Sequence, residues 1–269
     1  FGEHHICNTT ATASCSGMPK VSALIGDDLQ NDFGATVTDK TDYSSQVESP
    51  LIIAVSGDLT QKANHQEFQD AFSFLEDLSN KTLLKRKVTK ENIFVIPGNH
   101  DVQFAQSTQD ERFQPYCSFY NKFYKGVRTH QDSFEPIGLT QIHLRNIDNN
   151  KFLIAEINCC MYVEKDTVDS SRGQIDFNSL KKLRKELERI TTENNDLEEY
   201  IKIAMIHHHI VLLPSFIEAG RGVDAVMNAG YLLELLSEYG FHLILHGHKH
   251  YPNIFTYEPV PLWVESSNR

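Results

Sequence analysis

Four short polar motifs in this sequence combine residue types that bind metal ions and transfer protons. They are Gly57-Asp58, Gly98-Asn99-His100-Asp101, His207-His208-His209 and Gly247-His248-Lys249-His250. Carboxylate, amide and imidazole ligands together suit Mn, Fe or Zn better than Ca or Mg alone. Packing does not readily explain so many histidines in so few segments. We therefore predict a metal site.

Asp58 and Asn99 offer oxygen ligands. The carboxylate of Asp58 has two oxygens, so it can bridge two cations and neutralise part of their charge, and Gly57 lets backbone approach closely. Asn99 can give its amide oxygen to a cation. Taken alone, an Asp after a strand is more often a cap or turn residue, and Asn99-His100 after a Pro-Gly stop is more often an exposed turn. The inference therefore depends on the motifs together.

The histidines divide into candidates for ligands and candidates for packing. His248 and His250 are two residues apart, so in a short loop they can reach different ions. His207 ends an apolar segment, where an imidazole without a partner would be costly. His100 can act as a ligand or as a proton donor. For three others we favour a packed or supporting role, namely His208, His209 and His246.

Each motif follows an apolar run that predicts a buried β-strand. The runs are Leu51–Ser56, Ile93–Ile96, Ile201–Ile206 and Phe241–Leu245. A near-continuous apolar run is typical of a strand that is covered on both faces. Ligands of α/β folds gather outside the carboxyl ends of strands, which is where the four motifs fall. We expect the motifs to meet there.

Helical periodicity separates these strands and predicts an α/β layer architecture. Asn64 and Glu67 fit a capping box for a helix that ends near Ser79. An aromatic face at spacings of three and four predicts a core-packing helix over Asp110–Lys125. The other predicted elements are a helix near Val21–Asp32, a loop over residues 6–17, a hairpin of Leu139–Ile147 with Phe152–Cys159, a helix over Asp176–Ile190, and a helix from Val223 or Asn228 to Tyr239.

Composition favours one domain over residues 1–269, because no linker separates the motifs. The formal net charge is −11, and phosphate-binding surfaces usually need an excess of Lys and Arg, so nucleic acid is not an expected partner. The two most basic stretches, Lys81–Lys87 and Lys181–Arg189, alternate with apolar residues as exposed helix faces do. We expect no broad nucleic-acid-binding face, which leaves a small local basic patch open.

Cysteine usage and hydropathy bear on the compartment. The 5 cysteines show no disulfide or zinc-ribbon spacing, which suits a reducing compartment. No apolar run approaches the roughly 20 residues of a membrane span. We expect a cytoplasmic protein without a membrane partner.

In this order, and each after a strand, the four motifs resemble those of the calcineurin-like metallophosphoesterase superfamily. The resemblance covers essentially the whole chain. It implies a four-layer αββα sandwich with two mixed sheets, and two divalent metal ions, with Mn, Fe or Zn preferred. Asp58 would bridge the two ions. By the same resemblance, Asn99, His207 and His248 would complete one metal site and His250 would bind the other ion.

The resemblance also implies a reaction. The family hydrolyses a phosphodiester or phosphomonoester by means of a metal-bridging hydroxide, and the substrate here would be a small-molecule phosphoester. His100, oriented by Asp101, would protonate the leaving-group oxygen. Two cations roughly 3.5–4 Å apart can clamp a phosphoryl group and acidify a bridging water. The Gly57-Asp58-Leu59-Thr60 segment and Asp101 resemble the branch of the superfamily that contains small-molecule phosphodiesterases. The protein phosphatases typically carry a Glu where Asp101 stands.

This sequence departs from the family pattern at its start. Family members begin with an apolar strand that ends in Asp-x-His, often followed by Phe-Gly, and this sequence begins at Phe1-Gly2. We hypothesise that this sequence is a fragment of the family domain. It would lack the first strand at its N-terminus, and it would lack further residues at its C-terminus. For the chain as given we predict weak or single-metal occupancy and poor turnover. The alternatives are a nuclease subunit of the same superfamily and a non-catalytic scaffold with this fold.

Overall fold

The computed structural model describes residues 50–83, 85–128, 139–164, 172–211 and 225–249, together with Ile254 and Thr256. The predicted loop over residues 6–17, the helix near Val21–Asp32 and the ligand His250 lie outside this part of the chain.

Two groups of strands carry the motifs. β1 (Ile53–Val55) pairs in parallel with β4 (Ile93–Val95). A four-stranded sheet has the order β5-β6-β7-β8. In it, β5 (Gln141–Ile147) and β6 (Asn150–Ile157) are antiparallel, and the other neighbours are parallel. The last two strands are β7 (Ile201–Ile206) and β8 (Leu243–Leu245).

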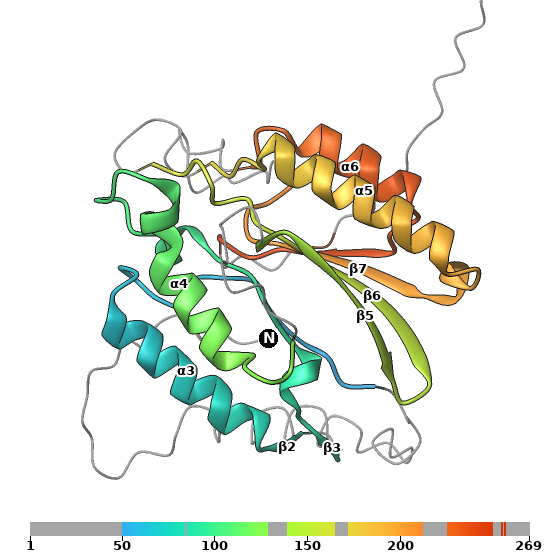
Figure 1. Ribbon diagram of the computed structural model, residues 1–269, viewed down its shortest axis with the longest axis horizontal. Helices are drawn as coiled ribbons and strands as arrows, with labels where there is room; N and C mark the ends of the chain where they lie inside the picture. Colours follow the sequence, from blue (N-terminus) through green and yellow to red (C-terminus); the bar gives the residue numbers. More distant parts are fainter. Residues whose placement is uncertain are drawn as a thin grey trace, which may run out of the picture.

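Helices lie on both sides of these strands (Figure 1). α3 (His65–Ser79) and α4 (Gln109–Phe123) lie side by side on one side, and the rings of Phe68 and Phe119 stack between them. α5 (Phe177–Glu193) and α6 (Ala229–Glu238) lie on the other side, joined by an ion pair between Arg184 and Glu238. The described chain is thus a mixed α/β structure with one mixed sheet. The four-layer sandwich with two mixed sheets stays a prediction.

The local signals of the sequence explain most element boundaries. Asn64 and Glu67 form the predicted capping box, and Asp176 caps α5 through the N–H groups of its first turn. α6 ends at Glu238 before Gly240, whose φ of +66° closes the helix as expected. The turn between β5 and β6 uses Asp148 and Asn149, both with positive φ. The predicted hairpin and these helices are confirmed.

The aromatic face of α4 packs into the core as predicted, and three tyrosines also fasten the helix to other elements. The hydroxyl groups of Tyr116 and Tyr124 donate to the carbonyl oxygens of Val95 and Ile93 in β4, and Tyr120 donates to Glu156 of β6. All three side chains are fully buried. Because Tyr116 and Tyr124 hold β4, α4 helps to position the segment that follows β4.

Two expectations about these elements are wrong. We expected all four motif-bearing strands to be buried on both faces, but Ala54 of β1 is exposed and Leu243 of β8 is 47 % exposed. β8 is the edge strand of the four-stranded sheet, and β1 has only β4 as a described neighbour. An apolar run does not indicate which other elements will cover a strand. The basic stretch Lys81–Lys87 is not a helix face. It forms the short hairpin of β2 (Thr82–Leu83) and β3 (Arg86–Lys87), which turns at Lys85 with a φ of +62°.

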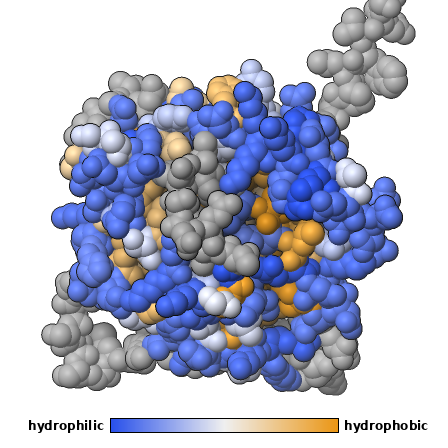
Figure 2. Space-filling view, viewed as in Figure 1, coloured by the Kyte–Doolittle hydropathy of each residue, from blue (hydrophilic) through white to orange (hydrophobic). Residues whose placement is uncertain are grey.

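The 3-10 turns complete the connections, at Lys90–Asn92, Asn99–Asp101 and Leu197–Glu199. The face of the molecule in Figure 2 is mainly hydrophilic, and its apolar side chains appear in separate areas. Among the described residues, no helix is both long and apolar enough to cross a bilayer.

Candidate metal centre

The loop after β1 brings the first motif against two others. Gly57 has a φ of +97° and Asp58 a φ of +57°, so the backbone turns sharply where the strand ends. A Cβ atom on Gly57 would lie 2.5 Å from the backbone nitrogen of Gly98 and 2.7 Å from Nδ1 of His207. Only a glycine leaves room for this contact. The motifs that follow β1, β4 and β7 therefore converge as expected.

The loop after β4 interlocks with the same turn. A Cβ atom on Gly98 would lie 2.2 Å from Oδ1 of Asp58 and 2.8 Å from Cε1 of His207. The next residues, Asn99–Asp101, form a 3-10 turn, and the backbone N–H of His100 donates to Oδ1 of Asp58 at 3.0 Å. This turn directs Asn99 toward β7 while the ring of His100 stays exposed.

Three ligand atoms from three loops meet at one point. Oδ1 of Asn99 is 2.9 Å from Nε2 of His207 and 3.0 Å from Nδ1 of His248, and the two histidine nitrogens are 3.3 Å apart. Oδ2 of Asp58 is 3.4 Å from Nε2 of His207. Two ligand atoms about 2.1 Å from one ion, at right angles to each other, lie about 3.0 Å apart. The four spacings fit a common ion.

Hydrogen bonding fixes which nitrogen of His207 is available to an ion. Its Nδ1 is 2.6 Å from the carbonyl oxygen of Ser56, which can only accept, so Nδ1 carries the proton and Nε2 presents a lone pair. That lone pair faces the amide oxygen of Asn99, and two acceptors at 2.9 Å repel each other unless a cation or a proton lies between them. The residues present thus fit a bound metal ion.

His248 reaches this point through a strained turn. Its φ is +75°, a left-handed conformation that non-glycine residues rarely adopt and that clusters at functional sites. Gly247 before it donates its N–H to the carbonyl oxygen of His207, and a Cβ atom there would lie 2.5 Å from Oγ of Ser56. Contacts to the ends of β1 and β7 therefore set the position of His248.

Asp101 has a different place from the one expected. Its fully buried carboxylate accepts hydrogen bonds from the backbone of Gly98, Leu59 and Thr60, and from the hydroxyl of Thr60. The ring of His100 instead has its Nδ1 3.1 Å from the carbonyl oxygen of Gln61. The expected contact between Asp101 and the His100 ring is absent, because the carboxylate is turned toward the loop after β1.

Burial raises the pKa of Asp101 to about 7, and the nearby charge of Asp58 acts in the same direction. The hydrogen bonds from Gly98 and Thr60 oppose this rise. A bound cation would favour the charged form. Because an opposite charge favours the ionised form, metal binding would lower the pKa of Asp101.

The remaining histidines pack around the centre, as we favoured. His208 is fully buried, and its ring centroid is 4.3 Å from that of His248 and 4.9 Å from that of His207. Nδ1 of His209 lies 2.8 Å from Nδ1 of His246, and burial together with His246 lowers the pKa of His209 to about 4. Ligand atoms of His207, His208 and His248 lie within 4.8 Å of one another. His208 is close enough to join the centre, which its sequence position alone did not indicate.

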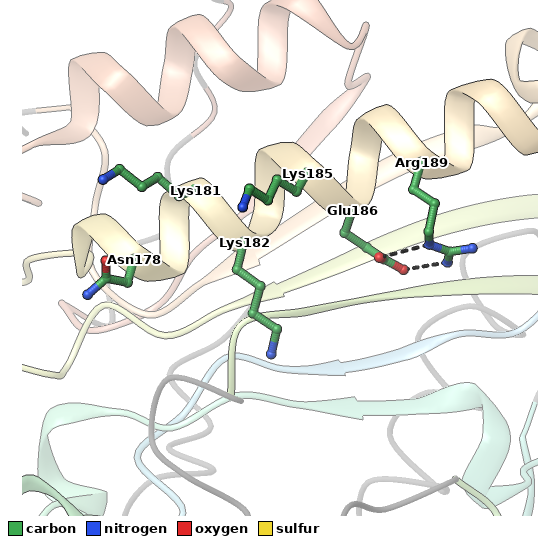
Figure 3. A pocket seen from close by; sticks show the side chains of 6 residues that line it. All are labelled: Asn178, Lys181, Lys182, Lys185, Glu186 and Arg189. Carbon is green, nitrogen blue, oxygen red and sulfur yellow. Dashed lines mark hydrogen bonds and ion pairs between the residues drawn. The ribbon is translucent and has the colours of Figure 1, made fainter.

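The second basic stretch lies apart from this centre. A shallow hollow on α5 is lined by Asn178, Lys181, Lys182, Lys185, Glu186 and Arg189 (Figure 3). Their side chains project from α5, whose opposite face is buried, and Arg189 pairs with Glu186 at 2.6 Å. This agrees with the predicted solvated helix face, and none of the candidate ligands lines the hollow.

Comparison with known proteins agrees with the geometry. A family model described as calcineurin-like phosphoesterase matches residues 27–252, which include all four motifs. A search of curated proteins gives no match.

Proposed function

Because the chain belongs to the calcineurin-like phosphoesterase family, whose members are generally metal-dependent phosphoester hydrolases, we propose that it hydrolyses a small-molecule phosphodiester or phosphomonoester at a dinuclear metal centre. One observation carries this proposal. The side chains of Asn99, His207 and His248 converge within 3.3 Å beside the carboxylate of Asp58.

Each convergent side chain has a place in such a centre. Asn99, His207 and His248 would hold one ion, and Asp58 would bridge it to a second. His250, which lies outside the described residues, is the proposed ligand of the second ion. Divalent cations bound here would offset the negative charge of the phosphoryl oxygens and lower the pKa of a water molecule. The mixed oxygen and imidazole ligands favour Mn, Fe or Zn.

The chain's own residues supply a proton donor at the edge of the centre. The backbone of His100 is held to Asp58, and its exposed ring has Nδ1 against the carbonyl oxygen of Gln61. That carbonyl can only accept, so Nδ1 keeps its proton and Nε2 faces away from Gln61. In the doubly protonated imidazolium form of His100, Nε2 also carries a proton, and we assign this proton to the leaving-group oxygen. The ring is then left neutral with its proton on Nδ1, and no alkoxide has to be expelled.

The test is hydrolysis of a bis-aryl phosphodiester and of an aryl phosphomonoester by the full chain, including any residues encoded before Phe1. Protein stripped with chelator should be inactive, and added Mn²⁺ should restore the reaction. Asn99→Ala should lose activity through weaker metal binding. His100→Ala should lose about 10²–10⁴-fold in kcat while metal binding is kept.

His65→Ala is the matched control, because His65 is an exposed histidine at the start of α3 and is not one of the proposed ligands. It should leave both the rate and the metal content unchanged. Absence of hydrolysis in the wild type, with no difference in His100→Ala, would contradict the proposal and favour a non-catalytic scaffold. Cleavage of a DNA oligonucleotide in preference to the aryl esters would favour the nuclease alternative.

A further inference from the structure

Beside the proposed phosphoesterase centre lies a second cluster, made of Cys159, Cys160 and His208. The Sγ atom of Cys159 is 3.1 Å from Nδ1 of His208, and Sγ of Cys160 is 3.9 Å from the same nitrogen. One ligand atom from each of the three residues lies within 4.8 Å of the other two, and all three residues are fully buried. None of them belongs to the ligand set proposed above.

Consecutive residues of a strand point to opposite faces, so the shared direction of the two sulfur atoms requires a turn. β6 ends at Ile157, and the backbone N–H of Cys160 donates to Oδ1 of Asn158 at 2.9 Å. The backbone oxygen of Cys159 accepts from Gln174. These bonds turn the chain at the end of β6, so that both sulfur atoms reach His208 at the end of β7.

The His208 ring is also packed closely against the backbone of a neighbouring segment. A Cβ atom on Gly173 would lie 2.7 Å from Cγ and Nδ1 of that ring, so the glycine lets the chain pass directly over it. Within the described residues, Nε2 of His208 has no hydrogen-bond partner. The ring is therefore held through Nδ1, and the partners of Nδ1 are the two sulfur atoms.

A buried cysteine usually behaves as a small apolar side chain, and Cys117 on α4 is an example. Burial raises the pKa of the Cys117 thiol to about 12. Cys159 differs. Its Sγ atom accepts a hydrogen bond from the backbone N–H of His208 at 3.4 Å and lies 3.1 Å from Nδ1 of the same residue. Two sulfur atoms beside one imidazole nitrogen are ligand types that bind a thiophilic cation, to which cysteine binds as a thiolate.

We propose that Cys159, Cys160 and His208 form a sulfur-containing metal site for a thiophilic cation, with Zn²⁺ as the best fit. Zinc bonds of about 2.3 Å to sulfur and about 2.0–2.1 Å to nitrogen, at a tetrahedral angle, place the two atoms about 3.6 Å apart. The distances of 3.1 and 3.9 Å lie on either side of that value. Soft thiolates select such cations over Ca²⁺ or Mg²⁺.

Binding would link the ends of two neighbouring parallel strands. Cys159 and Cys160 follow β6, while His208 follows β7 and comes directly after His207. An ion held by all three would fix the backbone next to His207. This site requires no phosphoesterase activity, so its test can succeed or fail separately from that of the proposed function.

The experiment uses Co²⁺ as the probe, because thiolate bonds to Co²⁺ give a near-ultraviolet charge-transfer absorption that oxygen and imidazole ligands do not. The full chain, stripped with chelator and titrated with Co²⁺, should develop this band. Cys159→Ala and Cys160→Ala should each lose most of it. Cys117→Ala, which removes a buried thiol elsewhere, should keep the full intensity.

A measurement on the wild type covers the case in which the cysteine variants fail to fold. X-ray absorption at the zinc edge of zinc-loaded protein should show sulfur neighbours at about 2.3 Å from the metal. The inference is overturned if only oxygen and nitrogen neighbours are found. It is equally overturned if no cobalt–thiolate band forms in the wild type, or if the band persists in both Cys159→Ala and Cys160→Ala.

Discussion

At the scale of single residues, two glycines explain why the candidate ligands can meet. Gly57 and Gly98 lie so close to each other and to His207 that a methyl group on either would overlap backbone or ring atoms. The ligands supply the chemistry, whereas the glycines let the loops after β1 and β4 approach the end of β7. A substitution that adds one carbon atom should therefore disturb a site to which it contributes no ligand.

Gly57→Ala tests this expectation against Gly126→Ala. Both glycines have positive φ, +97° and +79°, but a Cβ atom on Gly126 would meet nothing within 4 Å. Gly126→Ala should cost about 1–2 kcal/mol from backbone strain alone. Gly57→Ala should cost about 1–3 kcal/mol more from overlap and should weaken metal binding. Urea unfolding and calorimetric metal titration measure both effects, and equal losses in the two variants would contradict the argument.

The family resemblance predicted which side chains would lie together better than it predicted their individual contacts. The sequence indicated that Asn99, His207 and His248 could share an ion, and their ligand atoms are close together. It did not indicate that Asp101 would face the loop after β1, because a carboxylate beside a histidine in sequence has no fixed direction in space. The pairing of Cys159 with His208 joins residues 49 positions apart, so no local spacing could reveal it.

At the scale of elements, the centre depends on where strands end. The apolar runs located β1, β4, β7 and β8, and helical spacing, with capping signals at α3 and α6, located the described α-helices. Burial could not be predicted equally well, because the exposure of Ala54 and Leu243 depends on which neighbours complete each sheet. The Lys81–Lys87 stretch was misjudged for a related reason. A short hairpin of two-residue strands is too brief to show a period.

Asp101 connects the loops after β1 and β4. It is not a proposed metal ligand, but its removal should still disturb the metal centre. Without its carboxylate, the N–H groups of Gly98, Leu59 and Thr60 lose their common acceptor, and the loops after β1 and β4 can separate. We expect Asp101→Ala to weaken metal binding by about 10–100-fold, as is usual when a group that orients a metal ligand is lost. Calorimetric titration with Mn²⁺ measures the change.

Asp70→Ala provides the matched control, because Asp70 is an exposed carboxylate on α3. It should bind Mn²⁺ like the wild type. If Asp101→Ala kept its metal affinity and lost only kcat, Asp101 would act on the proton donor His100, as first expected from the sequence. A larger loss of metal affinity than of kcat therefore indicates that Asp101 holds the two loops together, and the reverse indicates that it acts on His100.

At the scale of the whole molecule, a buried charged network joins the two groups of strands. Arg128, which follows α4, donates to both carboxylate oxygens of Glu156 in β6 and to the carbonyl oxygen of Ile93 in β4. Oε1 of Glu156 accepts from the backbone of Val95, and Oε2 lies 3.1 Å from Nε2 of His143. The same side chains thus contact β4, β5 and β6, so the network sets how the two groups of strands meet.

This network predicts a sign for the dependence of stability on pH. Burial alone would raise the pKa of Glu156, but Arg128 and His143 hold it well below its ordinary value of 4.5. A carboxyl group with a lower pKa in the folded chain stabilises the fold at every pH above its unfolded pKa. That contribution is lost as the pH falls below about 4.5. Burial lowers the pKa of His143, which acts in the same direction below its ordinary value of 6.5.

Glu156→Gln should therefore be strongly destabilising and should flatten the acid side of the stability profile. The amide keeps the shape of the side chain but leaves Arg128 buried without its counter-charge, which typically costs about 3–5 kcal/mol. Urea unfolding at neutral pH and below pH 5 measures the loss. Combining the change with Arg128→Met should recover part of the lost stability, because the orphaned charge is then removed.

Glu238→Gln, which breaks the exposed pair with Arg184, should leave unfolding unchanged. Equal effects of Glu156→Gln and Glu238→Gln would show that the network does not hold the two groups of strands together.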